Sequence, residues 1–227
     1  MSTAHKDIAR QVINVLGIGG GIALNAIVPR VGDDVGEVSR RVEPMLSAAG
    51  WAFAIWGVIF LSTAAFAVWQ ALPAQRTSSL LRRVGVWPAV NGIGGGLWVL
   101  AFTHQHFVLA VAIMLVILGS LIMVERRSVG AVGFEHGLVR VPFGLNLGWI
   151  CVATVLNVAQ TLHWLGWNGA PASPLFWSML VVVVAGAIGA ALVLLRRQRA
   201  AGVAVVWGLA GVVSAQRGSV DTLAWCA

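Results

Sequence analysis

The chain has 227 residues, of which 59% are hydrophobic and only 10% are charged. A typical soluble domain carries roughly 45–50% apolar and about 25% charged residues, so this composition excludes that class. The formal net charge of +7 would suit a nucleic-acid-binding protein, but the charges lie between long apolar runs rather than along one face. The sequence therefore predicts an all-α integral membrane protein with no nucleic-acid partner.

Seven apolar segments reach or approach the roughly 20 residues that a helix needs to cross a bilayer. In chain order they cover residues 11–29, 48–72, 84–103, 107–124, 141–162, 175–195 and 201–216, and none contains Asp, Glu, Lys or Arg. We predict a polytopic membrane bundle of seven transmembrane helices in a single domain, residues 1–227. The seventh segment is the shortest, which leaves open whether it spans completely.

The connecting segments differ in kind. The third and fourth apolar segments are separated by so few residues that they must form an antiparallel hairpin. The first loop, residues 30–47, is long and carries both acidic residues and arginines. Loops of this length serve as lids or binding elements, or they are disordered. We keep both alternatives for this loop.

Orientation follows from the placement of Lys and Arg. Eleven of these residues fall before the first segment and in the second, fourth and sixth loops, and four fall on the other side. Because cytoplasmic loops retain positive charge, this distribution predicts a cytoplasmic N-terminus and an outside C-terminus in the cell membrane.

Aromatic and amide side chains are the polar groups available inside the spans. Tryptophans near span ends are expected to be interfacial anchors, namely Trp51, Trp87, Trp164, Trp167 and Trp225. Trp56, Trp98 and Trp149 lie deeper, where an indole N–H still needs a partner. A buried amide must likewise bond to another helix or to a ligand, and this applies to Asn14, Asn25, Asn91, Asn146 and Asn157.

The fifth apolar segment carries the most informative group. Trp149, Ala153 and Asn157 are spaced four residues apart, which places them on one face of a helix. The small Ala153 leaves room between an indole and an amide. We expect this face to line a flat pocket.

Two glycine-rich runs look like phosphate-binding loops but are followed by neither Lys-Ser nor Lys-Thr and lie inside apolar segments. Gly17 with Gly21 and Gly92 with Gly96 are small-xxx-small pairs, which permit close helix packing. The sequence leaves open whether that packing occurs within one chain or across a homodimer.

Several function classes lack their essential residues. A retinal protein needs a lysine in its last span, whereas Lys6 is the only lysine and precedes the first. Ion-coupled transporters commonly use intramembrane charges, but all eight carboxylates lie outside the apolar segments. Cys151 and Cys226 are not expected to form a structural disulfide. We predict no catalytic residue, no metal site and no required cofactor, so the protein is not expected to be an enzyme.

Two segments resemble the signature of the translocator protein family, TspO/MBR, also called tryptophan-rich sensory proteins. The first resembling run is Gly50-Trp51-Ala52-Phe53-Ala54-Ile55-Trp56-Gly57-Val58-Ile59-Phe60, and the second is Pro142-Phe143 followed by Trp149, Ala153-Thr154 and Asn157. Asn25 and Pro29 before a long loop are similar to the longer bacterial members. The resemblance covers about residues 20 to 160.

The resemblance implies a five-helix core, residues 1–163, with residues 164–227 forming two additional C-terminal helices. It also implies an apolar pocket capped by the first loop that binds tetrapyrroles such as protoporphyrin IX, or sterol- or isoprenoid-like molecules. We expect a membrane receptor or sensor with a porphyrin as candidate ligand and Trp56, Phe60, Asn91, Trp98, Trp149, Ala153 and Asn157 as its binding residues. The alternatives are a transporter or exchanger of small lipophilic molecules and, ranked last, an enzyme that degrades its tetrapyrrole.

Overall fold

The computed structural model describes residues 3–42, 48–167 and 174–224, and every regular element in this part of the chain is helical. The elements are α1 (Thr3–Val31), α2 (Val35–Val42), η2 (Gly50–Ala54), α3 (Ile55–Ala71), η3 (Pro73–Gln75), α4 (Ser79–Val84), α5 (Trp87–Thr103), α6 (Phe107–Arg127), α7 (Gly133–Glu135), η4 (His136–Arg140), α8 (Val141–Trp164), α9 (Pro174–Arg196) and α10 (Arg199–Ala224). The predicted all-α class is confirmed.

Each predicted apolar segment coincides with a long helix, in order α1, η2 with α3, α5, α6, α8, α9 and α10. Four helical stretches are long and apolar enough to cross a membrane, Thr3–Val31, Gly50–Ala71, Phe107–Arg127 and Gly133–Trp164. The apolar parts of α9 and α10 that meet the same test of composition are shorter, Val182–Arg196 and Arg199–Ala215. The chain is therefore built as a multi-pass membrane protein, while the count of seven crossings stays a prediction.

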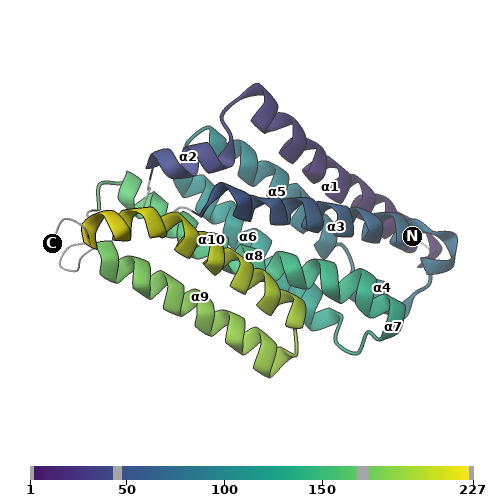
Figure 1. Cartoon of the computed structure of the whole chain (residues 1–227). Helices are drawn as coiled ribbons and strands as arrows, with labels where there is room; N and C mark the ends of the chain where they lie inside the picture. Colours follow the sequence, from purple (N-terminus) through teal and green to yellow (C-terminus); the bar gives the residue numbers. More distant parts are fainter. Residues whose placement is uncertain (1–2, 43–47, 168–173, 225–227) are drawn as a thin grey trace.

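The long helices form one bundle (Figure 1). Helix α5 packs against both α1 and α6, α8 contacts α6 and α10, and α9 lies beside α10 along one flank. Helix α1 begins at one end of the bundle and α10 ends at the other. The core between the helices is apolar, with fully buried side chains that include Phe66, Phe102, Phe107, Leu121 and Ile150.

The predicted hairpin between the third and fourth segments is confirmed. Helix α5 ends at Thr103 and α6 begins at Phe107. The turn between them places Gln105 at φ 60°, in the left-handed region. The His106 N–H closes the turn by donating to the carbonyl of Ala101 at 2.8 Å.

The glycine pairs bring α1 and α5 into backbone contact within one chain. A Cβ on Gly21 would overlap the Gly92 backbone, and a Cβ on Gly17 would lie 2.7 Å from the Cα of Ala89. Such close approach gives two membrane helices dispersion contact that larger side chains would prevent. The packing interpretation of these runs is therefore confirmed for this helix pair.

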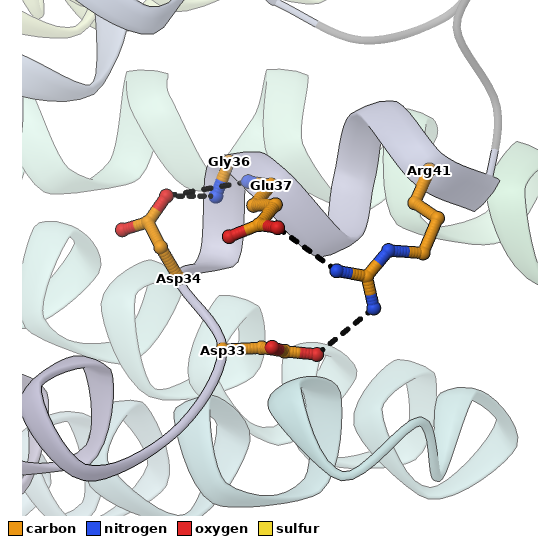
Figure 2. A network of polar contacts seen from close by, with 5 residues as sticks. All are labelled: Asp33, Asp34, Gly36, Glu37 and Arg41. Atoms are coloured by element: carbon orange, nitrogen blue, oxygen red, sulfur yellow. Dashed lines mark hydrogen bonds and ion pairs between the residues drawn. The ribbon is translucent and has the colours of Figure 1, made fainter.

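The first loop contains helix α2, so the disordered alternative is wrong for residues 35–42. Asp34 caps this helix, because its Oδ1 accepts from the N–H groups of Gly36 at 2.9 Å and Glu37 at 3.2 Å. Arg41 donates to Asp33 at 3.0 Å and to Glu37 at 2.9 Å, as Figure 2 shows. Glu43, which we also assigned to this loop, lies outside the described residues.

Charged side chains of residues 33–41 pair with one another. The hydrogen bond from Arg41 to Asp33 raises the pKa of the Arg41 guanidinium above its ordinary value. The side chains of Arg41 and Asp33 are 53% and 41% exposed. Asp33, Asp34 and Glu37 thus stabilise α2.

The Glu125 carboxylate is buried at the end of a long apolar helix, directly after the predicted segment 107–124. Glu125 belongs to α6, which is among the four long apolar helices, and is only 6% exposed. It accepts from Nη2 of Arg140 at 2.7 Å and from Nε2 of Gln198 at 2.5 Å. This cluster ties the turn between α9 and α10 to the ends of α6 and α8.

Candidate ligand-binding site

Two neighbouring cavities lie inside the bundle, with Trp98 in the wall of both. The first, which we call the α2 cavity, lies beneath α2 and has a free volume of about 40 Å³. Its lining residues come from α2, the segment before α3, α5, α8 and α10, and are Val35, Ser39, Ala48, Phe53, Trp98, Phe102, Trp149, Val152, Ala153, Leu156, Asn157, Gln160 and Gly208. The lining is mostly apolar, as in ligand sites, but such sites commonly have volumes of about 300–1,000 Å³, so a ligand would have to widen the α2 cavity.

Helix α8 supplies one wall of the α2 cavity. Trp149, Ala153 and Asn157 all line it, with Gln160 following on the same face. The helix runs unbroken from Val141 to Trp164, with Pro142 in its first turn, where proline is tolerated because no intrahelical N–H bond is lost. The spacing found in the sequence therefore does bring these three side chains to one cavity.

Two buried hydrogen-bond donors line this cavity without a protein partner. Nε1 of Trp98 donates to Oδ1 of Asn157 at 3.0 Å, which orients the amide. Nδ2 of Asn157 and Nε1 of Trp149 then have no hydrogen-bond partner among the described residues. Asn157 is 2% and Trp149 is 4% exposed. A buried donor left unpaired costs about 1–3 kcal/mol, which an acceptor on a ligand would recover.

Aromatic rings surround Trp149. Its ring meets Phe53 edge to face at 5.9 Å between centroids, and Trp56 in the same manner at 6.1 Å. On α5, the rings of Trp98 and Phe102 are stacked, with 4.9 Å between their centroids. Such contacts fix ring orientation, so the α2 cavity has flat and preformed aromatic walls.

Helix α2 covers the cavity and is hydrogen-bonded to α8, which forms one of the cavity walls. Val35 and Ser39 line the cavity from α2, and Nε2 of Gln160 on α8 donates to Oγ of Ser39. Both polar residues are buried. This contact holds the first loop closed over the cavity, in the position of a lid.

Helix α10 closes another side of the same cavity. Gly208 lines it, and Nε1 of Trp207 donates to the carbonyl of Ala52 in η2 at 2.8 Å. The N–H of Ala49 donates to the carbonyl of Gly211 at 3.0 Å. Helix α10 is thus part of the cavity wall, although none of the predicted binding residues lies in it.

The second cavity, which we call the amide cavity, lies among α1, α3, α5, α6 and α8 and has a free volume of about 30 Å³. Trp56, Phe60 and Asn91 line it together with Asn146. Nδ2 of Asn146 donates to Oδ1 of Asn91 at 3.0 Å, so these two amides join α8 to α5. Oδ1 of Asn146 has no partner among the described residues.

The seven predicted binding residues therefore do not surround one space. Trp149, Ala153 and Asn157 line the α2 cavity, Trp56, Phe60 and Asn91 line the amide cavity, and Trp98 separates the two. Ser39, Phe53, Gln160 and Gly208 were missed. Ser39 lies in the short helix α2 and Gly208 in a distant helix, and neither carries a local signal that links it to α8. Of the predicted interfacial tryptophans, Trp51 and Trp164 are half exposed, and Trp225 lies outside the described residues.

The chemistry of the two linings is limited to hydroxyl, amide and indole groups. Among the described lining residues there is no Asp, Glu, His, Lys, Arg or Cys. The described part of the chain also brings no three metal-ligating side chains together. The linings therefore combine apolar surface with a few hydrogen-bonding groups.

The fold and its cavities define a multi-pass helical membrane protein with an apolar interior site. A family model described as TSPO-like protein matches residues 11–227, and the chain belongs to this family. The resemblance seen in the sequence is therefore confirmed. The comparisons find no matching curated protein and no matching solved structure.

Proposed function

We propose that this protein is a membrane receptor or sensor that binds one planar apolar ligand in the α2 cavity, and that this ligand carries a hydrogen-bond acceptor. The observation that carries the proposal is the pair of buried donors, Trp149 Nε1 and Asn157 Nδ2, on the wall of an apolar cavity. Because the closed cavity has a free volume of only about 40 Å³, the ligand binds when α2 moves away from α8. A tetrapyrrole such as protoporphyrin IX has a flat face for the aromatic walls and carboxylates that accept hydrogen bonds. A sterol- or isoprenoid-like alcohol offers one oxygen for the same donors.

Binding rather than catalysis is supported by the lining. General acid and base chemistry requires a titratable group within reach of the ligand, and the described lining residues provide none. The proposal needs no cofactor.

The test is a protoporphyrin IX titration of the purified protein, followed by the porphyrin absorption band. Trp149→Phe keeps an aromatic ring but removes the N–H donor. Hydrogen bonds to charged groups contribute about 1.5–3 kcal/mol, so we expect affinity to fall roughly tenfold or more. Trp87→Phe is the control, because Trp87 lines neither cavity and packs under the guanidinium of Arg127. Equal affinity of Trp149→Phe and Trp87→Phe would contradict the proposed site.

A transporter of small lipophilic molecules is the second candidate, and the position of Trp98 favours it. This side chain is the shared wall of the two cavities. In a transporter, movement of this side chain would have to join the two cavities into one passage. Uptake of a porphyrin into proteoliposomes, faster for Trp98→Ala than for the parent protein, would support transport. Binding without uptake in either protein would support the receptor.

The seven-span topology, with a cytoplasmic N-terminus and an outside C-terminus, belongs to the same proposal. It is supported by the coincidence of each apolar segment with a helix. A homodimer through glycine-rich faces would have to use residues such as Gly19 and Gly20, where an added Cβ would meet no described atom of another helix within 4 Å. Gly17, Gly21 and Gly92 already pack between α1 and α5.

A further inference from the structure

A third hollow lies away from both cavities, between α9 and α10. This α9–α10 groove has a free volume of about 820 Å³ and is open along one side. Small residues on both helices create it, including Gly186, Gly189 and Ala190 on α9 and Gly202 and Ala210 on α10. The two helices lie side by side on one flank of the bundle (Figure 1).

The sides of the groove are apolar and exposed. Leu194 is 76%, Val203 63% and Val206 69% exposed, and all three line the groove. In a membrane protein, such side chains face hydrocarbon, because water contact would be unfavourable. The groove is therefore a lipid-facing surface that is concave rather than smooth.

One end of the groove is basic. Arg199 lines the groove, is exposed and makes no ion pair with any described residue, and Arg196 and Arg197 stand beside it in the turn. The nearby carboxylate of Glu125 is already bonded to Arg140 and Gln198. Arg199 is also the first residue of α10, where the helix dipole favours an anion.

The length of the groove matches half of a bilayer. From Arg199 to Ala210 a helix rises about 17 Å at 1.5 Å per residue. The hydrocarbon core of a bilayer is about 30 Å thick, so the groove covers about one leaflet. A single acyl chain would lie along it with its headgroup at Arg199.

From this combination of an apolar groove, one-leaflet length and a basic end, we propose that the α9–α10 groove is a binding site for one anionic phospholipid. The acyl chain packs against the glycines and valines, and the phosphate is held by Arg199 with Arg196 and Arg197 near. Basic residues beside a membrane helix attract anionic lipids in this way. A second copy of the chain is the less favourable occupant, because a dimer seam there would bury Arg199 without a counter-charge.

The experiment is native mass spectrometry of the full-length protein, exchanged from detergent into mixtures of phosphatidylglycerol and phosphatidylcholine. The parent protein should retain phosphatidylglycerol in preference to phosphatidylcholine. Arg199→Gln should lower that retention about fivefold, which corresponds to about 1 kcal/mol per basic residue at the membrane surface. The matched control is Arg83→Gln, which removes the same charge from an exposed arginine on α4.

A second variant tests the groove itself. Ala190→Trp fills the groove with apolar bulk at an exposed position and leaves the charge unchanged. We expect it to reduce the retention of phosphatidylglycerol as Arg199→Gln does, while the protein stays monodisperse. The proposal is overturned if both lipids are retained equally by the parent, if Arg83→Gln and Arg199→Gln lose lipid to the same extent, or if Ala190→Trp converts a dimer to a monomer without changing lipid retention.

Discussion

The indole N–H of Trp98 donates to Oδ1 of Asn157 at 3.0 Å, and this single contact decides what Asn157 can offer a ligand. An indole N–H can only donate, so the amide oxygen of Asn157 must face α5. The amide nitrogen is left on the other side, buried and without a partner among the described residues. Trp98 thereby converts an amide with two possible roles into a hydrogen-bond donor for the α2 cavity.

Replacing Asn157 tests this donor. In Asn157→Leu the side chain keeps its approximate volume but loses both the donor and the acceptor for Trp98. We expect the affinity for protoporphyrin IX, measured by absorption titration, to fall at least severalfold. Asn14→Leu is the comparison, because Asn14 bonds to the carbonyl of Gly85 and the N–H of Ala89 and lines neither cavity. It should lower thermal stability without changing affinity, and a similar loss of affinity in both variants would argue against a direct contact with Asn157.

The lid offers a kinetic prediction. Gln160→Leu removes the donor that holds Ser39 of α2 over the cavity. A net contribution of about 0.5–1.5 kcal/mol for such a bond predicts a dissociation rate for bound porphyrin that rises about two- to tenfold. Stopped-flow displacement measures this rate. Arg41→Gln, which alters α2 only on its exposed side, should change the rate little. If both variants release ligand at the parent rate, α2 does not gate the cavity.

Because α1 and α5 are in backbone contact, replacing glycine by alanine should affect stability differently at Gly21 and at its neighbour Gly20. Gly21→Ala forces a methyl group into the Gly92 backbone and should destabilise the protein by about 1–3 kcal/mol, as overpacking does. Gly20→Ala meets nothing within 4 Å among the described residues and should be neutral or stabilising by up to about 1 kcal/mol, since Ala is the better helix former. Thermal unfolding in detergent compares the two. The same sign for both would contradict the packing of these helices.

The sequence was sufficient where a local pattern carries the information. Apolar segment length located the long helices, and i, i+4 spacing brought Trp149, Ala153 and Asn157 to one wall. It was insufficient where a contact depends on distant helices. Nothing local indicates that Trp98 divides the interior into two cavities, or that Gly208 of α10 closes one of them.

The structural roles of charged residues were likewise not predictable from the sequence. The composition of the first loop revealed its acidic residues but not that Asp34 caps a helix within it. The burial of Glu125 could not be predicted, because its partners Arg140 and Gln198 come from other elements and reach it only after the bundle has formed.

That buried cluster predicts a large stability effect. Glu125→Gln removes the charge that pairs with Arg140, whose side chain is 11% exposed, and leaves the guanidinium without its counter-ion. Loss of one partner of a buried ion pair costs about 3–5 kcal/mol. Asp33→Asn is the control, because it breaks a pair between exposed side chains and should leave thermal stability nearly unchanged. An equally small effect of both substitutions would show that Glu125 is not held in a buried pair.

The proposed orientation is testable by cysteine labelling with a reagent that does not cross membranes. Val31 is 80% exposed at the end of α1, and Val132 is 76% exposed before α7, at a loop predicted to be cytoplasmic. Cys226→Ser provides the background, and Cys151 is buried. In intact cells Val31→Cys should be labelled and Val132→Cys should react only after permeabilisation, because the first loop lies outside if the excess of positive charge stays in the cytoplasm. Labelling of Val132→Cys alone in intact cells would reverse the orientation, and labelling of both would exclude the predicted number of crossings between them.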